Sequence, residues 1–200
     1  MTKFSPGLIF LLGALAALGA AAIDMYLPSL PSIQSELGGV SGNAQFTLSS
    51  FFIGLGVGQL FYGPISDALG RRKVLVVGLL LYCLGSLFCF FAGTMMELVI
   101  ARFFQALGAA AGGVISRAMV RDVFNGEKAA QAQSFINLAF SLTPLMAPLV
   151  GGYLLIFFGW RSTFLALFLF GIICLLILVL KIPETLPIEK RNSLRLVRIV

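Results

Sequence analysis

The sequence predicts an all-α membrane protein with six transmembrane helices. Three observations lead to this fold class: 59% of the 200 residues are hydrophobic, only 11% are charged, and the mean hydropathy is +1.01. Soluble domains are about a quarter charged, and an apolar stretch of roughly 20 residues is long enough to cross a bilayer. Because the lipid interior forces the backbone to satisfy its own hydrogen bonds, each such stretch is expected to be a helix.

Short connections divide the apolar sequence into six predicted helices, at residues 8–30, 45–62, 74–93, 97–119, 131–158 and 162–180. The transmembrane unit is therefore expected to cover residues 1–181, and residues 182–200 form a polar, basic tail. A cleaved signal peptide is an alternative for Lys3 and the apolar run that reaches Gly19 and the following alanines. That run continues to about Leu30, however, and five more apolar stretches follow it.

The cations are distributed unevenly between the two sides of the predicted membrane. One side carries Arg161, and Arg102 falls inside a helix. The other side carries Lys3, Arg71, Arg72, Lys73, Arg117, Arg121, Lys128, Lys181, Lys190, Arg191, Arg195 and Arg198. By the positive-inside rule, both ends of the chain are expected to be cytoplasmic. The net charge of +6 is then a topology signal, and we expect no nucleic-acid partner.

The residue inventory argues against an enzyme. The chain contains no histidine, which excludes Ser-His-Asp and Cys-His hydrolysis and histidine-ligated metals. Cys83, Cys89 and Cys174 all fall in apolar segments, where a cysteine acts as a small hydrophobic residue. We therefore expect no catalytic residues, no metal site and no cofactor.

Two ionisable residues lie inside the predicted spans, where each is energetically costly and marks a functional site by default. Asp24 lies near the end of the first span, and Arg102 lies at a similar depth in the fourth. One interpretation is that the two side chains pair and hold the bundle together. The other is that one or both line a polar cavity, where burial disfavours the charged carboxylate and a nearby guanidinium favours it.

Polar residues extend this pattern along two helices. Gln105 shares a helical face with Arg102, three residues away. In the fifth span, Ser134, Asn137, Ser141, Pro144, Pro148 and Gly151 follow one stripe. Each proline removes a backbone hydrogen bond and favours a bend. Whether such a bend gates a path or only serves packing remains open from the residues alone.

Residues 63–73 are predicted to form the loop between the second and third spans. Read as G-x-x-x-D-x-x-G-R-R-K, this stretch resembles the signature of the major facilitator superfamily, with Gly63, Asp67, Gly70, Arg71, Arg72 and Lys73 in place. Leu98-x-x-x-Arg102-x-x-Gln105-x-x-Gly108 is similar to the fourth-helix motif of drug/proton antiporters. Residues 144–152 resemble their fifth-helix motif, with Ala147 where that motif usually has glycine. Residues 24–31 resemble the bicyclomycin/chloramphenicol resistance branch.

This resemblance implies the N-terminal six-helix half of a major facilitator fold, built as a 3+3 pseudo-repeat. Family members have twelve helices in two halves around a central cavity. The second half is then a missing partner, and residues 182–200 are expected to begin the cytoplasmic linker between the halves. A fragment of a longer protein is the favoured interpretation, and a parallel homodimer of six-helix chains is the alternative.

The resemblance also implies roles for single residues. Proton coupling and the substrate cavity are assigned to Asp24, Arg102, Gln105, Asn137 and Ser141. A cytoplasmic conformational latch is assigned to Gly63, Asp67, Gly70, Arg71, Arg72 and Asp122, where Asp122 is the expected partner of Arg71. The helix-bending antiporter motif comprises Pro144, Pro148, Gly151 and Gly152.

The implied function is proton-coupled efflux of small amphipathic drugs or antibiotics across the bacterial cytoplasmic membrane. On this view the energy source is the proton gradient, and the partners are drugs, protons and the lipid bilayer. Two alternatives remain: a metabolite/proton symporter or facilitator on the same scaffold, and a six-helix membrane protein that acts as an interaction partner without transporting.

Overall fold

The computed structural model describes residues 6–37 and 43–191 and contains six helical segments long and apolar enough to cross a membrane. Lys3, Arg195 and Arg198, which the sequence analysis placed on the cytoplasmic side, lie outside these residues. The elements are α1 (Pro6–Asp24), η1 (Leu27–Ser29), α2 (Leu30–Glu36), α3 (Asn43–Leu69), α4 (Arg71–Phe91), α5 (Met95–Val123), α6 (Gly126–Phe158), α7 (Arg161–Lys181) and η2 (Ile188–Lys190). The first span consists of α1, η1 and α2 together.

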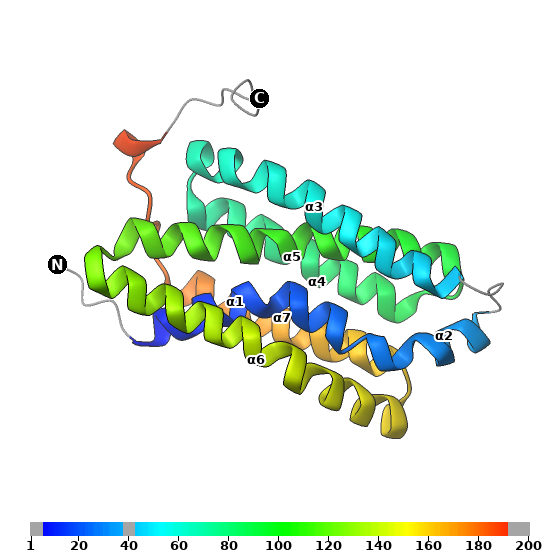
Figure 1. Ribbon diagram of the computed structural model, residues 1–200. Coiled ribbons are helices and arrows are strands. Elements are labelled where there is room, and N and C mark those ends of the chain that lie inside the picture. The colour runs from blue at the N-terminus through cyan, green and yellow to red at the C-terminus, as the bar shows by residue number, and fades with distance from the viewer. Residues whose placement is uncertain (1–5, 38–42, 192–200) are drawn as a thin grey trace.

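The helices form two groups of three, and each group packs helices against the other group, which confirms the predicted 3+3 pseudo-repeat (Figure 1). The first triplet is the first span with α3 and α4, and the second is α5, α6 and α7. In each triplet the second helix packs on the first helix of the other one, so that α3 lies on α5 and α6 lies on α1. The third helices, α4 and α7, pack on each other.

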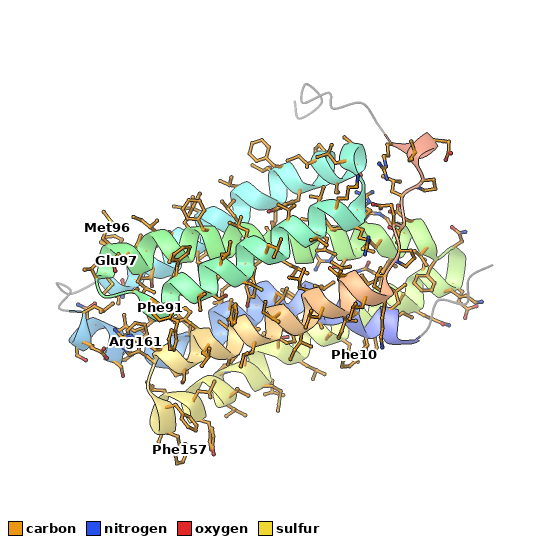
Figure 2. All side chains as sticks on the ribbon, turned by 180° about the vertical axis from the view of Figure 1, so that it is seen from behind. Phe10, Phe91, Met96, Glu97, Phe157 and Arg161 are labelled. Atoms are coloured by element: carbon orange, nitrogen blue, oxygen red, sulfur yellow. The ribbon has the colours of Figure 1, made fainter. Side chains whose placement is uncertain are left out.

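Gly70 and Arg161 mark the two ends of the bundle. At the Gly70 end, α3 turns into α4, and α1 begins near the place where α7 ends (Figure 1). At the Arg161 end, Glu97 and Arg161 lie on neighbouring parts of the bundle, far from Phe10 (Figure 2). In the spanning windows 61% of the α5 residues are buried, against 17% for α3 and 11% for α6. The fourth span is thus the centre of the bundle.

The first span is broken, whereas the sequence predicted one helix through residue 30. Its α-helix ends at Asp24, and a 3-10 turn leads into α2. The amide of Tyr26 donates to the carbonyl of Ile23, three residues back, instead of to Ala22. Pro28 and Pro31 follow this break, and neither has an amide hydrogen to continue a helical ladder.

The prediction of a loop at residues 63–73 is wrong, because nearly all of this stretch is helical. α3 runs through Pro64 to Leu69, and α4 starts at Arg71. The hydroxyl of Ser66 donates to the carbonyl of Gly63 at 3.0 Å, which supplies one hydrogen bond near the proline. The chain reverses at Gly70, whose φ of 100° is readily accessible only to glycine.

Candidate functional site: a charged cavity in the bundle

A cavity of about 300 Å³ opens on the face of the bundle formed by α1, α3, α5 and α6. Its walls are mainly small or apolar, and two charged side chains line it, Asp24 from α1 and Arg117 from α5. Gln59 of α3 adds an amide, and Phe140 and Pro144 of α6 complete the wall. α4 and α7 contribute nothing to this lining and form the opposite face, seen in Figure 2.

Asp24 is the predicted site residue that the structure places in this cavity. Its carboxylate is partly buried, and within residues 6–37 and 43–191 it forms no ion pair or hydrogen bond. The alternative in which Asp24 pairs with Arg102 is therefore wrong for this conformation. The reason is that Arg102 is already engaged elsewhere.

Arg102 is completely buried beside the cavity and does not line it. Its Nη1 donates to the carbonyl of Ala22 at 3.0 Å and to Oε1 of Gln105 at 2.7 Å. The guanidinium carbon lies 4.5 Å from the ring centroid of Tyr26 and 4.1 Å from that of Phe51. Aromatic faces attract a desolvated cation by about 2 kcal/mol or more. These rings replace a counter-ion.

Gln105 carries the contact of Arg102 further into the bundle, as their shared helical face predicted. Its Nε2 donates to the hydroxyl of Ser86 at 2.8 Å, and that hydroxyl donates to the carbonyl of Tyr82 at 2.8 Å. Both Ser86 and Gln105 are fully buried. A continuous polar chain thus connects α1, α5 and α4 through an otherwise apolar core.

The break in the first span is held from two sides. The carbonyl of Ala22 lacks its usual helical donor, since the amide of Tyr26 is turned to Ile23, and Arg102 supplies the missing hydrogen bond. From α6, Gly151 approaches so closely that a Cβ there would lie 2.1 Å from the carbonyl oxygen of Met25. The arginine and glycine of the two antiporter-like motifs therefore meet at the segment that carries Asp24.

Only some of the predicted site residues of α6 line the cavity. Pro144 lines the cavity, but Asn137 and Ser141 are exposed on α6 outside its lining. The amide oxygen of Asn137 accepts a hydrogen bond from Gln133 at 3.3 Å. Pro144 and Pro148 both lie inside one uninterrupted helix, so the prolines do not divide α6.

Two of the predicted latch residues, Asp67 and Asp122, meet Arg71 at the Gly70 end, where Arg71 is only 8% exposed. Its Nε donates to Oδ2 of Asp122 at 3.0 Å, and its Nη1 forms an ion pair with Asp67. The expected contact between Arg71 and Asp122 is thus present. The carboxylate of Asp67 remains 40% exposed, so part of it is open to a further partner. Arg72 turns away and donates to the carbonyl of Val179 at 2.7 Å.

Two residues that the sequence analysis missed complete this cluster. Nη1 of Arg71 donates to the buried hydroxyl of Ser66 at 2.7 Å, and the backbone amide of Arg71 donates to Oε1 of Glu184 at 2.9 Å. The position of Ser66, one residue before Asp67, was a usable signal because it lies only five residues from Arg71 in the sequence. Glu184 carried no such signal, since its partner is 113 residues away.

Arg117 and Glu36 were also missed as site residues. Arg117 was counted as a cation flanking the fourth span, although it already lay within the helix predicted at residues 97–119, and α5 includes it. Glu36 forms an ion pair with Arg161 and accepts a hydrogen bond from the indole of Trp160 at 2.7 Å. This contact fastens the end of the first span to the start of the sixth at the Arg161 end.

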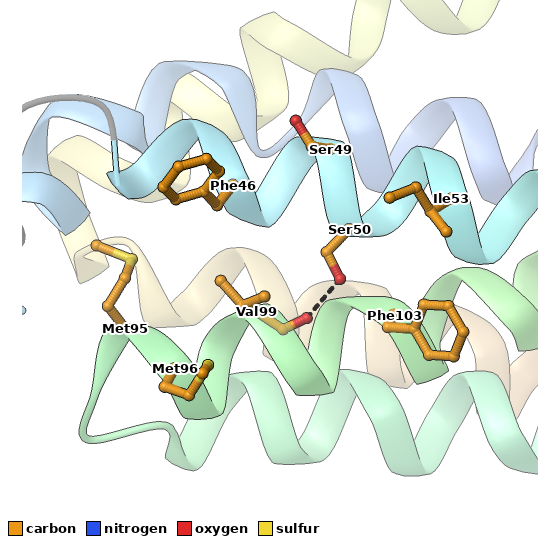
Figure 3. A pocket seen from close by; sticks show the side chains of 8 residues that line it. All are labelled: Phe46, Ser49, Ser50, Ile53, Met95, Met96, Val99 and Phe103. Carbon is orange, nitrogen blue, oxygen red and sulfur yellow. Dashed lines mark hydrogen bonds between the residues drawn. The ribbon is translucent and has the colours of Figure 1, made fainter.

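A second, larger pocket lies between α3 and α5 near the Arg161 end (Figure 3). Its volume is about 670 Å³, and its lining is mainly Phe, Met, Ile and Val side chains. The hydroxyl of Ser50 points across it and donates to the carbonyl of Val99 at 2.7 Å. No charged residue lines this pocket. The smaller cavity, with Asp24 and Arg117, is therefore the candidate site for coupled chemistry.

The six spans form two interpacked groups of three, and ionisable residues line one cavity between them. This architecture is that of one half of a membrane transporter. A family model described as Major Facilitator Superfamily matches residues 9–196. The chain therefore belongs to this superfamily, as its motifs predicted.

The curated proteins that the chain resembles include members of the family named for drug resistance. It is 44% identical over 186 residues to the uncharacterized MFS-type transporter YdgK of Bacillus subtilis, and 37% identical over 188 residues to a bicyclomycin resistance protein homolog of Haemophilus influenzae. It is 32% identical over 182 residues to multidrug resistance protein D of Escherichia coli. These alignments cover 92%, 94% and 91% of this chain and 46%, 47% and 46% of the relatives. The chain spans about half the length of the curated relatives it matches.

Solved structures show the same fold. The human organic anion transporter MFSD10 superposes with a TM-score of 0.72 at 23% identity, covering 94% of this chain and 50% of that one. The proton:xylose symporter XylE superposes with a TM-score of 0.76 at 19% identity, covering 91% of this chain and 46% of that one. In both matches the six helices correspond to about half of the solved chain.

Proposed function

We propose that this chain forms the six-helix half of a proton-coupled exporter of small amphipathic drugs. The observation that carries the proposal is the unpaired carboxylate of Asp24 in a membrane cavity. A carboxylate inside a membrane is costly when ionised, and an acid without a fixed cation can gain or lose its proton as water enters or leaves. The relatives named for bicyclomycin and multidrug resistance support drugs as the substrate class.

In this mechanism Asp24 binds and releases the proton, and Arg102 acts on Asp24 through the backbone. Arg102 holds the carbonyl of Ala22, two residues before Asp24, and so sets the end of α1. When the break in the first span shifts, Asp24 changes its exposure to water. The transporter alternates between two states in this mechanism. The contacts of Arg71 with Asp67 and Asp122 close the Gly70 end in one of them. We place that end and both ends of the chain on the cytoplasmic side of the membrane.

Asp24→Asn in the transporter that contains this chain with its second half tests the proposal. Asparagine keeps the size of the side chain but cannot carry a proton. In inside-out vesicles energised by a proton gradient, added drug should release the gradient in the wild type and leave it unchanged in the variant. Glu97→Gln is the control, because it removes a carboxylate near the Arg161 end that does not line the cavity.

Three outcomes would contradict the proposal or indicate a different class of protein. Drug-driven proton release that persists in Asp24→Asn would remove Asp24 from the proton path. A gradient that changes in the opposite direction on substrate addition would indicate symport. No response to any substrate, with both halves present and correctly inserted, would favour a protein that interacts without transporting.

A further inference from the structure

The second charge of the cavity, Arg117, has no role in the mechanism above. It lies on α5, six residues before the helix ends at Val123, and its side chain is exposed toward the cavity that it lines. Its guanidinium carbon lies 6.0 Å from the ring centroid of Phe140, another lining residue. In the part of the chain that the structure describes, Arg117 forms no ion pair and no hydrogen bond.

Arg117 and Asp24 occupy opposite ends of the cavity. Gly112 of α5 lies level with Leu15 of α1, since a Cβ on Gly112 would lie 2.4 Å from the carbonyl oxygen of Leu15. Arg117 follows Gly112 by five residues toward the Gly70 end, and Asp24 follows Leu15 by nine toward the Arg161 end. At 1.5 Å per residue, their backbones are about 20 Å apart along the bundle axis. The two charges therefore do not neutralise each other directly.

From this arrangement we infer that Arg117 is a substrate contact that selects molecules with a carboxylate or a comparable acceptor group. The inference rests on the proposed function and adds a substrate class to it. A guanidinium always carries its charge and offers five N–H donors in a planar fork that matches a carboxylate. Arg102 differs from Arg117, because it is fully buried outside the cavity lining and its Nη1 already donates to two protein acceptors. Arg117 keeps its donors free, and the ring of Phe140 supports it at the wall.

Arg121 offers a matched comparison for the simpler role of a topology cation. It lies one turn further along α5, is exposed, and does not line the cavity. Replacing either arginine by glutamine removes one positive charge from the same end of the same helix. An effect on topology or on general electrostatics should appear in both variants, whereas an effect on substrate selection should appear only in Arg117→Gln.

Two dyes that differ by one methyl ester test the selection. Rhodamine 110 has a free carboxyl group, and rhodamine 123 is its cationic methyl ester. Energised inside-out vesicles with the complete transporter should take up rhodamine 110 in preference to rhodamine 123. Arg117→Gln should slow uptake of rhodamine 110 about tenfold, the loss expected for a charge-assisted hydrogen bond, while changing rhodamine 123 less than about twofold. Arg117→Lys, which keeps the charge, should retain part of the preference, and Arg121→Gln should retain all of it.

The outcomes separate this inference from the proposed function. Wild-type uptake of both dyes at equal rates, or an unchanged preference in Arg117→Gln, overturns the role of Arg117 while drug export stands. An equal loss of preference in Arg121→Gln also overturns it, because the effect would then come from charge alone. If the wild type takes up neither dye nor any other drug under a proton gradient, the proposed function fails and the inference falls with it.

Discussion

The backbone amide of Arg71 donates a 2.9 Å hydrogen bond to the Glu184 carboxylate, which lies beyond the last spanning helix. Arg71 is the first residue of α4, and Gly70 before it has no side chain to cap the helix. The same oxygen of Glu184 also accepts from the amides of Thr185 and Leu186, each at 3.1 Å. The segment after α7 is thereby folded onto the turn that holds the predicted latch.

Glu184→Ala should therefore loosen both the start of α4 and the segment that follows α7. Loss of a capping carboxylate costs about 1–2 kcal/mol. Hydrogen exchange should accelerate at the amides of Arg71 and Leu186 and remain unchanged in the middle of α4. Glu189→Ala is the control, since Glu189 is exposed in the same segment. Equal protection in wild type and Glu184→Ala would show that the cap contributes nothing in solution.

Asp122 and Asp67 both contact Arg71, but their burial predicts different contributions to stability. The side chain of Asp122 is 16% exposed and that of Asp67 is 40% exposed. Exposed ion pairs contribute under about 1 kcal/mol, whereas removing one partner of a buried pair costs about 3–5 kcal/mol. Double-mutant cycles with Arg71→Gln should thus give a larger coupling energy for Asp122→Asn than for Asp67→Asn. Equal couplings would mean that solvent exposure does not rank the two contacts.

Much of the fold could be predicted from the sequence because a bilayer allows few structures. Six apolar stretches of spanning length had to be helices, and the residues around Arg71 were specific enough to indicate the family. The error at the predicted loop occurred where the usual effect of a proline is overridden within the helix. Pro64 normally ends a helix, yet α3 continues through it with the hydroxyl of Ser66 bonded to the carbonyl of Gly63.

The candidate site was predicted less completely than the fold. Asp24 was identified because an isolated charge in an apolar stretch is easily recognised. Arg117 was not, because an arginine near a helix end is usually a topology cation, and only the packing of α1, α3, α5 and α6 shows that it lines the cavity. The Arg102 contact to Ala22 and the Glu184 cap depend on chain segments 80 and 113 residues apart. No sequence periodicity reports such contacts.

The buried hydrogen bonds of Arg102 predict a large effect of its removal. Arg102→Ala would leave a cavity between Tyr26 and Phe51 and would remove the donor from the carbonyl of Ala22. Loss of a large buried side chain costs about 2–5 kcal/mol, and an orphaned polar group adds about 1–3 kcal/mol.

Thermal unfolding of the purified protein in detergent, followed with a fluorogenic maleimide, provides the measurement for Arg102→Ala. Its signal comes from Cys83, Cys89 and Cys174, which are all buried. The variant should react at a clearly lower temperature than wild type, whereas Arg121→Ala, an exposed change on the same helix, should match wild type. Unfolding of Arg102→Ala at the wild-type temperature would contradict the structural role assigned to Arg102.

Gly151 and Gly152 form a matched pair for testing how α6 meets the break in the first span. A Cβ on Gly151 would lie 2.1 Å from the carbonyl oxygen of Met25, whereas a Cβ on Gly152 would have nothing within 4 Å among the described residues. Gly151→Ala should push α6 away from the first span at a cost of about 1–3 kcal/mol, and Gly152→Ala should unfold like wild type or slightly later, because alanine favours the helix. The maleimide assay reports both variants. Because Gly151 packs on Met25, the residue that directly follows Asp24, its variant should also weaken proton-driven transport. Equal unfolding temperatures for Gly151→Ala and Gly152→Ala would show that α6 can move away from the first span without a loss of stability.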